Sequence, residues 1–160
     1  MTTRKQCQLK FAISCVENGT RNFVVENRAF MYVDQDKMLE YNDINFVIPS
    51  YFPAWLSGFI EAEGCFRFNY DKRRAMQIST KFTIGQNFEH YLIKAIRDYF
   101  SGTVVIQAIV SKKEFSEKRN LLGVVKQYYI EMGNIEVKNS IISHLDKYPL
   151  MGHKLVTYTR

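Results

Sequence analysis

The segment from Trp55 to Gly64 constrains the fold of this 160-residue chain more than any other stretch. Its first half is apolar and predicts a helix. Gly58 and Ala62 stand about one helical turn apart, so one stripe of that helix carries almost no side chain. Such a stripe lets another backbone approach closely. We therefore expect this helix to pack against a second helix rather than to face water.

Two carboxylates, Glu61 and Glu63, end the same helix. The C-terminal end of a helix is the negative pole of its dipole, so a carboxylate there favours a nearby cation. Mg²⁺ is a hard cation that takes one or two carboxylates together with the phosphate oxygens of a substrate. The residues alone also fit a plainer interpretation, in which a buried helix ends in a charged turn with Gly64 as its C-cap.

The charge pattern divides the chain near residue 50. The formal net charge is +6, and residues 1–50 carry six basic and six acidic side chains, so the excess lies in residues 51–160. Pro49 and Pro53 interrupt regular structure at this boundary. We expect a neutral arm or linker-like extension over 1–50. The domain over 51–160 is basic and favours polyanionic partners.

Several classes of protein do not fit the sequence. No apolar run approaches the ~18 residues of a membrane span. The opening residues lack the pattern of a secretory signal, so we expect a protein that is neither membrane-bound nor secreted. Three widely spaced cysteines favour a reducing compartment over a disulfide scaffold, and the three histidines form no metal-binding pair at helical spacing.

The apolar periodicity of residues 51–160 predicts an α+β fold with the order α-β-β-α-β-β-α. Ser50 and Asn87 are candidate N-caps of the first two helices. In the arm, residues 8–16 and 22–30 have strand-like content. The expected elements are a helix over 52–62, strands over 65–71 and 76–84, a helix over 87–100, strands over 104–110 and 124–132, a helix from 134 to Pro149, and a short final helix or tail.

The segment from Leu56 to Gly64 resembles, position for position, the motif of the LAGLIDADG homing endonucleases. The expected element order is similar to that family's unit, which has a curved antiparallel sheet. The segments 80–86 and 144–154 resemble its second strand and its C-terminal stretch, and the likeness covers residues 52–158. It implies a site-specific, intron-encoded endonuclease for double-stranded DNA. It also implies an organellar protein, of a mitochondrion in preference to a chloroplast.

The resemblance further implies a set of active-site residues. Glu63, at a position where the family more often has Asp, would be the Mg²⁺ ligand, with the backbone carbonyl of Ala62 as a second ligand. Gln86 matches a residue that orients water and phosphate, and Lys154 matches a basic residue near the scissile phosphate. Together they would support metal-assisted phosphodiester hydrolysis. Glu61 is expected to be structural.

The outward positions of the first two strands predict a polar ribbon that fits the major groove of DNA. Arginine suits guanine, and asparagine or glutamine suits adenine, so such a ribbon could read sequence. The plainer alternative is a solvated sheet face. The candidate DNA-binding residues are Arg67, Asn69, Arg73, Gln77, Ser79, Lys81 and Thr83.

Cutting both strands of DNA needs two motif helices, but the chain contains one. The simplest solution is a homodimer with a near-palindromic target. The arm resembles the tail and linker of a preceding unit, so one half of a two-motif enzyme is the rival. An intron maturase or RNA-binding splicing factor also fits the sequence, as does an inactive remnant of a longer enzyme. The expected interface residues are Trp55, Gly58, Phe59 and Ala62.

Overall fold

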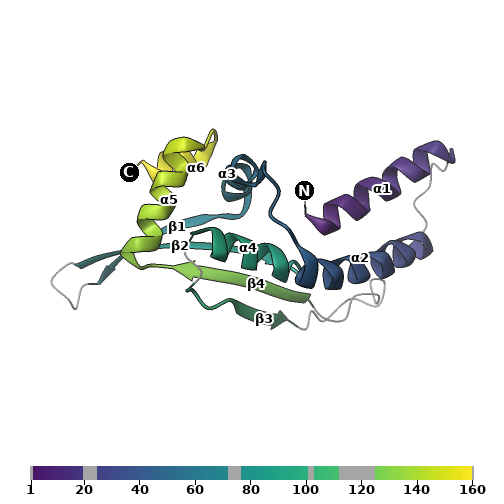
Figure 1. Cartoon of the computed structure of the whole chain (residues 1–160), viewed down its shortest axis with the longest axis horizontal. Helices are drawn as coiled ribbons and strands as arrows, with labels where there is room; N and C mark the ends of the chain where they lie inside the picture. Colours follow the sequence, from purple (N-terminus) through teal and green to yellow (C-terminus); the bar gives the residue numbers. More distant parts are fainter. Residues whose placement is uncertain (1, 20–24, 72–76, 101–102, 112–124, 160) are drawn as a thin grey trace.

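The computed structural model describes residues 2–19, 25–71, 77–100, 103–111 and 125–159, with some side chains at the edges of these ranges left out. Helices and strands alternate as an α+β fold, and two helices precede the motif helix (Figure 1). The elements are α1 (Thr3–Glu17), α2 (Val25–Asn45), α3 (Phe52–Glu63), β1 (Cys65–Asp71), β2 (Gln77–Asn87), α4 (His90–Phe100), β3 (Gln107–Ser111), β4 (Val125–Met132), α5 (Ile135–Lys147) and α6 (His153–Tyr158).

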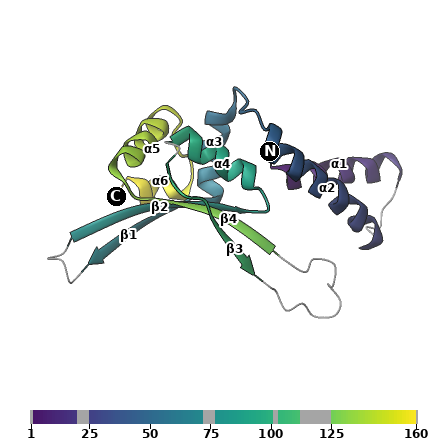
Figure 2. The same cartoon turned by 60° about the horizontal axis from the view of Figure 1, so that its bottom comes forward.

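The described strands form one antiparallel sheet in the order β1-β2-β4-β3. Figure 2 shows α3, α4, α5 and α6 on one side of this sheet. No described helix covers the opposite side. The α+β fold class and the expected order of elements after residue 50 are confirmed.

The covered side of the sheet explains the alternation seen in the sequence. Phe66 lies opposite Phe82, which lies opposite Met132, and Ile84 lies opposite Ile130. The last four of these side chains are buried under the helices. Because neighbouring residues of a strand point to opposite faces, the residues between them stand on the open side.

The β1–β2 hairpin extends beyond the helix layer (Figure 2). The alternation along it is as expected, but Ile78, on the same face as the buried Phe82 and Ile84, is 58% exposed. Phe68 and Tyr70 on the same face are exposed as well. Periodicity shows which face a side chain is on, whereas burial depends on how far the helices reach.

The boundaries of two helices differ from expectation. Tyr51, not Ser50, is the N-cap residue of α3, and its side chain makes no capping hydrogen bond. Asn87 is the last residue of β2 rather than the cap of α4, which begins at His90. The strand β3 also begins three residues later than predicted.

The arm is helical, so the prediction of strands over 8–16 and 22–30 is wrong where the structure describes these residues. The α1 and α2 helices lie side by side, and α2 packs against α4 (Figure 1). The backbone N–H groups of Thr3 and Arg4 each donate to a carboxylate oxygen of Glu89, both at 3.0 Å. A carboxylate from α4's start therefore stabilises the N-terminal end of α1.

That carboxylate is fully buried, and further contacts satisfy it. The hydroxyl of Tyr91 donates to Glu89 at 2.8 Å, and Asn42 of α2 donates to the hydroxyl of Thr3 at 2.9 Å. Phe88 has a φ of 66°, and its ring lies 5.2 Å from the Arg4 guanidinium. These contacts hold the arm on the domain.

A buried histidine ties the motif helix to the helices beside it. The hydroxyl of Ser57 in α3 donates to the carbonyl of Tyr148 at 2.6 Å, so it accepts a hydrogen bond from Nε2 of His144 at 3.1 Å. Nδ1 of His144 is then an acceptor, and the Tyr99 hydroxyl donates to it at 3.0 Å. Burial lowers the pKa of His144 below its ordinary value.

This neutral histidine predicts a loss of stability in mild acid. The unfolded chain binds a proton at His144 below about pH 6.5, whereas the folded chain resists it. The free energy of unfolding should therefore fall below that pH, by at most about 1.4 kcal/mol per pH unit from this group. Urea denaturation between pH 7.5 and 5.0 measures it.

The variant His144→Gln should remove this part of the pH dependence. His153→Gln, which removes an exposed histidine, is the matched control and should retain the slope. Equal slopes for all three proteins would contradict the prediction.

Candidate active site and nucleic-acid interface

Two hydrogen bonds join the C-terminal end of α3 to the first turn of α6. The ammonium group of Lys154 donates to the carbonyl oxygen of Ile60 at 3.1 Å. The backbone N–H of Lys154 donates to Oε1 of Glu61 at 3.0 Å. A cation thus lies at the negative pole of the motif helix, as its two carboxylates require.

Glu61 lies between these two helices. A Cβ added at Gly152 would collide with its carboxylate, so a larger residue there would require the Glu61 side chain to move. The other carboxylate oxygen, Oε2, is buried and has no hydrogen-bond partner among the described residues. The contacts of Glu61 agree with the structural role expected for it.

Glu63, by contrast, is exposed at the last position of α3. In the described part of the chain it makes no hydrogen bond or ion pair, so its oxygens are available to a ligand. No three His, Cys, Asp or Glu side chains gather into a metal-binding group within those residues. One exposed carboxylate beside the exposed Ala62 fits a Mg²⁺ site completed by phosphate, water and a second unit.

Gln86 lies apart from the other two predicted catalytic side chains. It has the parity of Phe82 and Ile84, so it stands on the helix-covered side of β2, opposite Tyr128. Its Oε1 accepts the backbone N–H of Asn87 at 2.9 Å. Among the described residues no hydrogen bond joins Gln86 to Glu63 or Lys154.

The open side of the sheet gathers most of the predicted DNA-binding residues. Arg67 lies opposite Lys81, and Asn69 lies opposite Ser79. Thr83 continues the same row on β2. Arg73 lies outside the described residues, and the register includes Gln77 although its side chain is not described.

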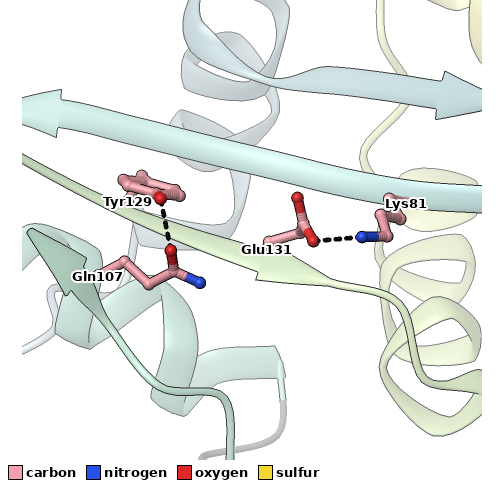
Figure 3. A network of polar contacts seen from close by, with 4 residues as sticks. All are labelled: Lys81, Gln107, Tyr129 and Glu131. Carbon is pink, nitrogen blue, oxygen red and sulfur yellow. Dashed lines mark hydrogen bonds and ion pairs between the residues drawn. The ribbon is translucent and has the colours of Figure 1, made fainter. Parts of the chain in front are cut away.

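Three polar residues of the open side were not singled out in the sequence. The Lys81 ammonium lies 2.6 Å from a carboxylate oxygen of Glu131, and the Tyr129 hydroxyl donates to Gln107 (Figure 3). Alternation along β4 could have identified two of them, because Tyr129 and Glu131 flank the buried Ile130. Strand β4 therefore contributes to this face as β1 and β2 do.

One stripe of α3 remains open. Gly58 and Ala62 are exposed, and a Cβ added at Gly58 would meet no atom within 4 Å. The half-buried Trp55 stacks on Phe59 with ring centroids 4.9 Å apart, and Phe59 is itself buried by this chain. The predicted interface thus has a bare centre flanked by aromatic rings.

The chain is similar in sequence to known endonucleases of one family. The profile described as LAGLIDADG endonuclease matches residues 56–160. A protein named probable intron-encoded endonuclease aI3 from Debaryomyces hansenii is 30% identical over 96% of this chain and 24% of its own length. One of the same name from Dictyostelium citrinum is 30% identical over 100% of this chain and 56% of its own length. The chain thus spans about half or less of these relatives.

Solved structures share the fold. The LAGLIDADG meganuclease I-CpaMI, solved with uncleaved DNA, is 25% identical, with a TM-score of 0.51 over 67% of this chain and 34% of its own. The LAGLIDADG homing endonuclease I-SmaMI, solved with cleaved DNA, is 23% identical, with a TM-score of 0.53 over 72% of this chain and 35% of its own. No described helix is long and apolar enough to cross a bilayer. With its profile match covering the motif helix, the sheet and α6, the chain belongs to the LAGLIDADG endonuclease family.

Proposed function

We propose that this chain is one unit of a site-specific endonuclease that cuts double-stranded DNA. The observation that carries the proposal is the exposed Glu63 at the end of α3, with the Lys154 ammonium fixed one turn away on Ile60. Beside it extends an open sheet face with Arg67, Lys81 and neutral polar side chains. The two DNA-bound structures of similar fold support this assignment.

DNA binding is proposed for the open face. A curved antiparallel ribbon fits the major groove, where Arg67 and Asn69 could donate to base edges. Ser79, Lys81 and Thr83 extend the same row toward α3. Arg73 and Gln77 are also proposed to bind DNA, and for these two side chains the support comes from the sequence alone. Base contacts would set the target, and cationic groups elsewhere would neutralise phosphates.

Mg²⁺ is the proposed cofactor. Glu63 and the carbonyl of Ala62 would hold it, and when bound it lowers the pKa of an attacking water and stabilises charge on phosphate oxygens. Lys154 would place a positive charge beside the reacting phosphate. The Gln86 side chain would orient phosphate or water once its hydrogen bond with the Asn87 N–H is broken. The likeness of segment 80–86 to the second strand of the family's unit supports that role.

The names of the curated relatives support an intron-encoded origin, and with it an organelle, for which we propose the mitochondrion. An intron maturase, which would bind RNA with the same basic domain, is the alternative. It has no need of an exposed carboxylate at the end of α3. The exposed Glu63 therefore favours the nuclease.

The first prediction tests the role of Glu63. Glu63→Gln should bind DNA like the unchanged protein and lower cleavage by about 10²-fold or more, because a metal-ligand oxygen is lost. The measurement is cleavage of a selected DNA target with Mg²⁺, beside a binding titration. Glu17→Gln alters an exposed glutamate that also ends a helix, and is the control. Full cleavage by Glu63→Gln, or in EDTA, would contradict the assignment.

The second prediction concerns how Lys154 is positioned. Glu61→Ala should lower cleavage about 10- to 100-fold with little change in DNA affinity, because the first turn of α6 loses its acceptor. Lys154→Ala should lower it more. If Glu61 acts through Lys154, the double variant should cut no more slowly than Lys154→Ala alone. Glu61→Gln, which retains an acceptor oxygen, should recover part of the rate, whereas additive losses would separate the two residues.

A second unit is needed to fill the open stripe of α3 and to supply a second carboxylate. We propose a homodimer through Trp55, Gly58, Phe59 and Ala62, because the same bare stripe on two copies is self-complementary. The greater length of the curated relatives supports the rival source, the other half of a two-motif protein.

The third prediction tests this interface. Gly58→Leu should leave the fold intact, because the site has free space, and should prevent both association and cleavage. Light scattering with and without DNA, together with circular dichroism, measures these effects. Ala12→Leu, in the half-buried part of α1, is the control. An active dimeric Gly58→Leu variant would show that α3 is not the interface. A wild-type chain that stays monomeric on DNA would favour the two-motif arrangement.

A further inference from the structure

The open sheet face contains an acid where phosphate repulsion would disfavour one. Glu131 extends from β4, and its Oε1 lies 2.6 Å from Nζ of Lys81 on β2 (Figure 3). Their side chains are 33% and 41% exposed, so both charged groups reach the surface that would meet DNA. Solvent-exposed ion pairs contribute little to folding stability. Stability alone therefore gives a weak reason for Glu131.

The position of this pair within the sheet restricts what it can do. Lys81 lies directly opposite Arg67, and Thr83 lies directly opposite Glu131. Two cations opposite each other repel, and Glu131 balances one of them. The ion pair holds the Lys81 ammonium, a hydrogen-bond donor, beside the Glu131 carboxylate, an acceptor, so the ammonium is not free to contact phosphate.

A donor and an acceptor held side by side match the edge of a G·C base pair. In the major groove guanine presents the acceptors O6 and N7, and cytosine presents the donor N4–H next to O6. The O6 and N4 atoms are about 2.9 Å apart, because a hydrogen bond joins them. The 2.6 Å between Nζ and Oε1 is close to that spacing.

We propose that Lys81 and Glu131 together read one G·C base pair of the DNA target, with Lys81 donating to guanine and Glu131 accepting from cytosine N4. The inference rests on the proposed DNA-binding function and specifies one position of the target. An A·T pair suits this couple less well. Adenine N6 and thymine O4 also set a donor beside an acceptor, but thymine has no second acceptor next to O4 as guanine has N7 next to O6. The thymine methyl group lies there instead.

The test is a binding profile of the whole 160-residue chain against DNA libraries in which each target position carries all four base pairs. Without divalent metal, binding is measured apart from cleavage. One position, or two related by symmetry in a dimer, should select G·C by about 5- to 150-fold over the other pairs. Glu131→Gln should flatten the preference there and leave the other positions unchanged. Losing a negative charge should raise overall affinity slightly.

Two controls separate base reading from charge. Glu40→Gln removes an exposed carboxylate on α2, away from the sheet, and should keep the full G·C preference. In a Lys81→Ala background, Glu131→Gln should have a smaller effect on the preference than in the unchanged protein, because the two side chains act as a couple. Should Glu131→Gln fail to fold, Glu131→Asp, which shortens the acid, should weaken the preference without abolishing it.

The possible outcomes distinguish failure of the paired G·C readout from failure of the proposed endonuclease function. Three results would overturn the paired readout while leaving the endonuclease proposal intact. They are a G·C preference that Glu131→Gln leaves unchanged, a preference for A·T at the affected position, and a loss of base preference spread equally over all positions. Failure of the unchanged protein to bind any library would overturn the proposed function and the inference with it.

Discussion

The two hydrogen bonds that Lys154 of α6 donates to α3 are the constraint on which the candidate active site depends. Ile60 accepts from the side chain of Lys154, and Glu61 accepts from its backbone. These bonds place a cation at the negative end of the motif helix and fix the turn that leads into β1. Because the bonded carbonyl and Glu61 precede Glu63, the carboxylate at the end of the helix remains free.

The same helix has two unlike sides. Leu56 and Ile60 are fully buried in the domain, and Ser57 joins it to the His144 hydrogen-bond network. None of the described residues covers the stripe around Gly58. A buried inner side and an open outer side suit the proposed role of this helix as an interface, since a second unit could contact it without altering this domain. The sheet repeats this division, because buried apolar side chains such as Phe82 and Ile84 lie under the helices, whereas Arg67 and Lys81 stand on the open side.

The sequence pattern correctly predicted those parts of the fold that depend on residues close together in the chain. The bounds of β1 and the faces of β1 and β2 follow from alternation, and the end of α3 follows from Gly64. The arm has strand-like content over 8–16 and 22–30, but it is helical where the structure describes it. The N-terminal end of α1 is bound by Glu89, which is 86 residues from Thr3 in the sequence. No local pattern reveals such a contact. The Lys81–Glu131 pair was missed for the same reason, since it joins two strands far apart in the chain.

The buried Glu89 also bears on the order in which the chain acquires structure. During synthesis α1 leaves the ribosome long before the carboxylate that completes its N-terminus, so early α1 has only Thr2 as a local cap. Non-local contacts form late because the intervening chain must first be ordered. We therefore expect the arm to remain solvated until β2 and α4 have folded and to dock as a last step. Translation pauses before residue 89 would then prolong the exposure of its apolar side chains to chaperones.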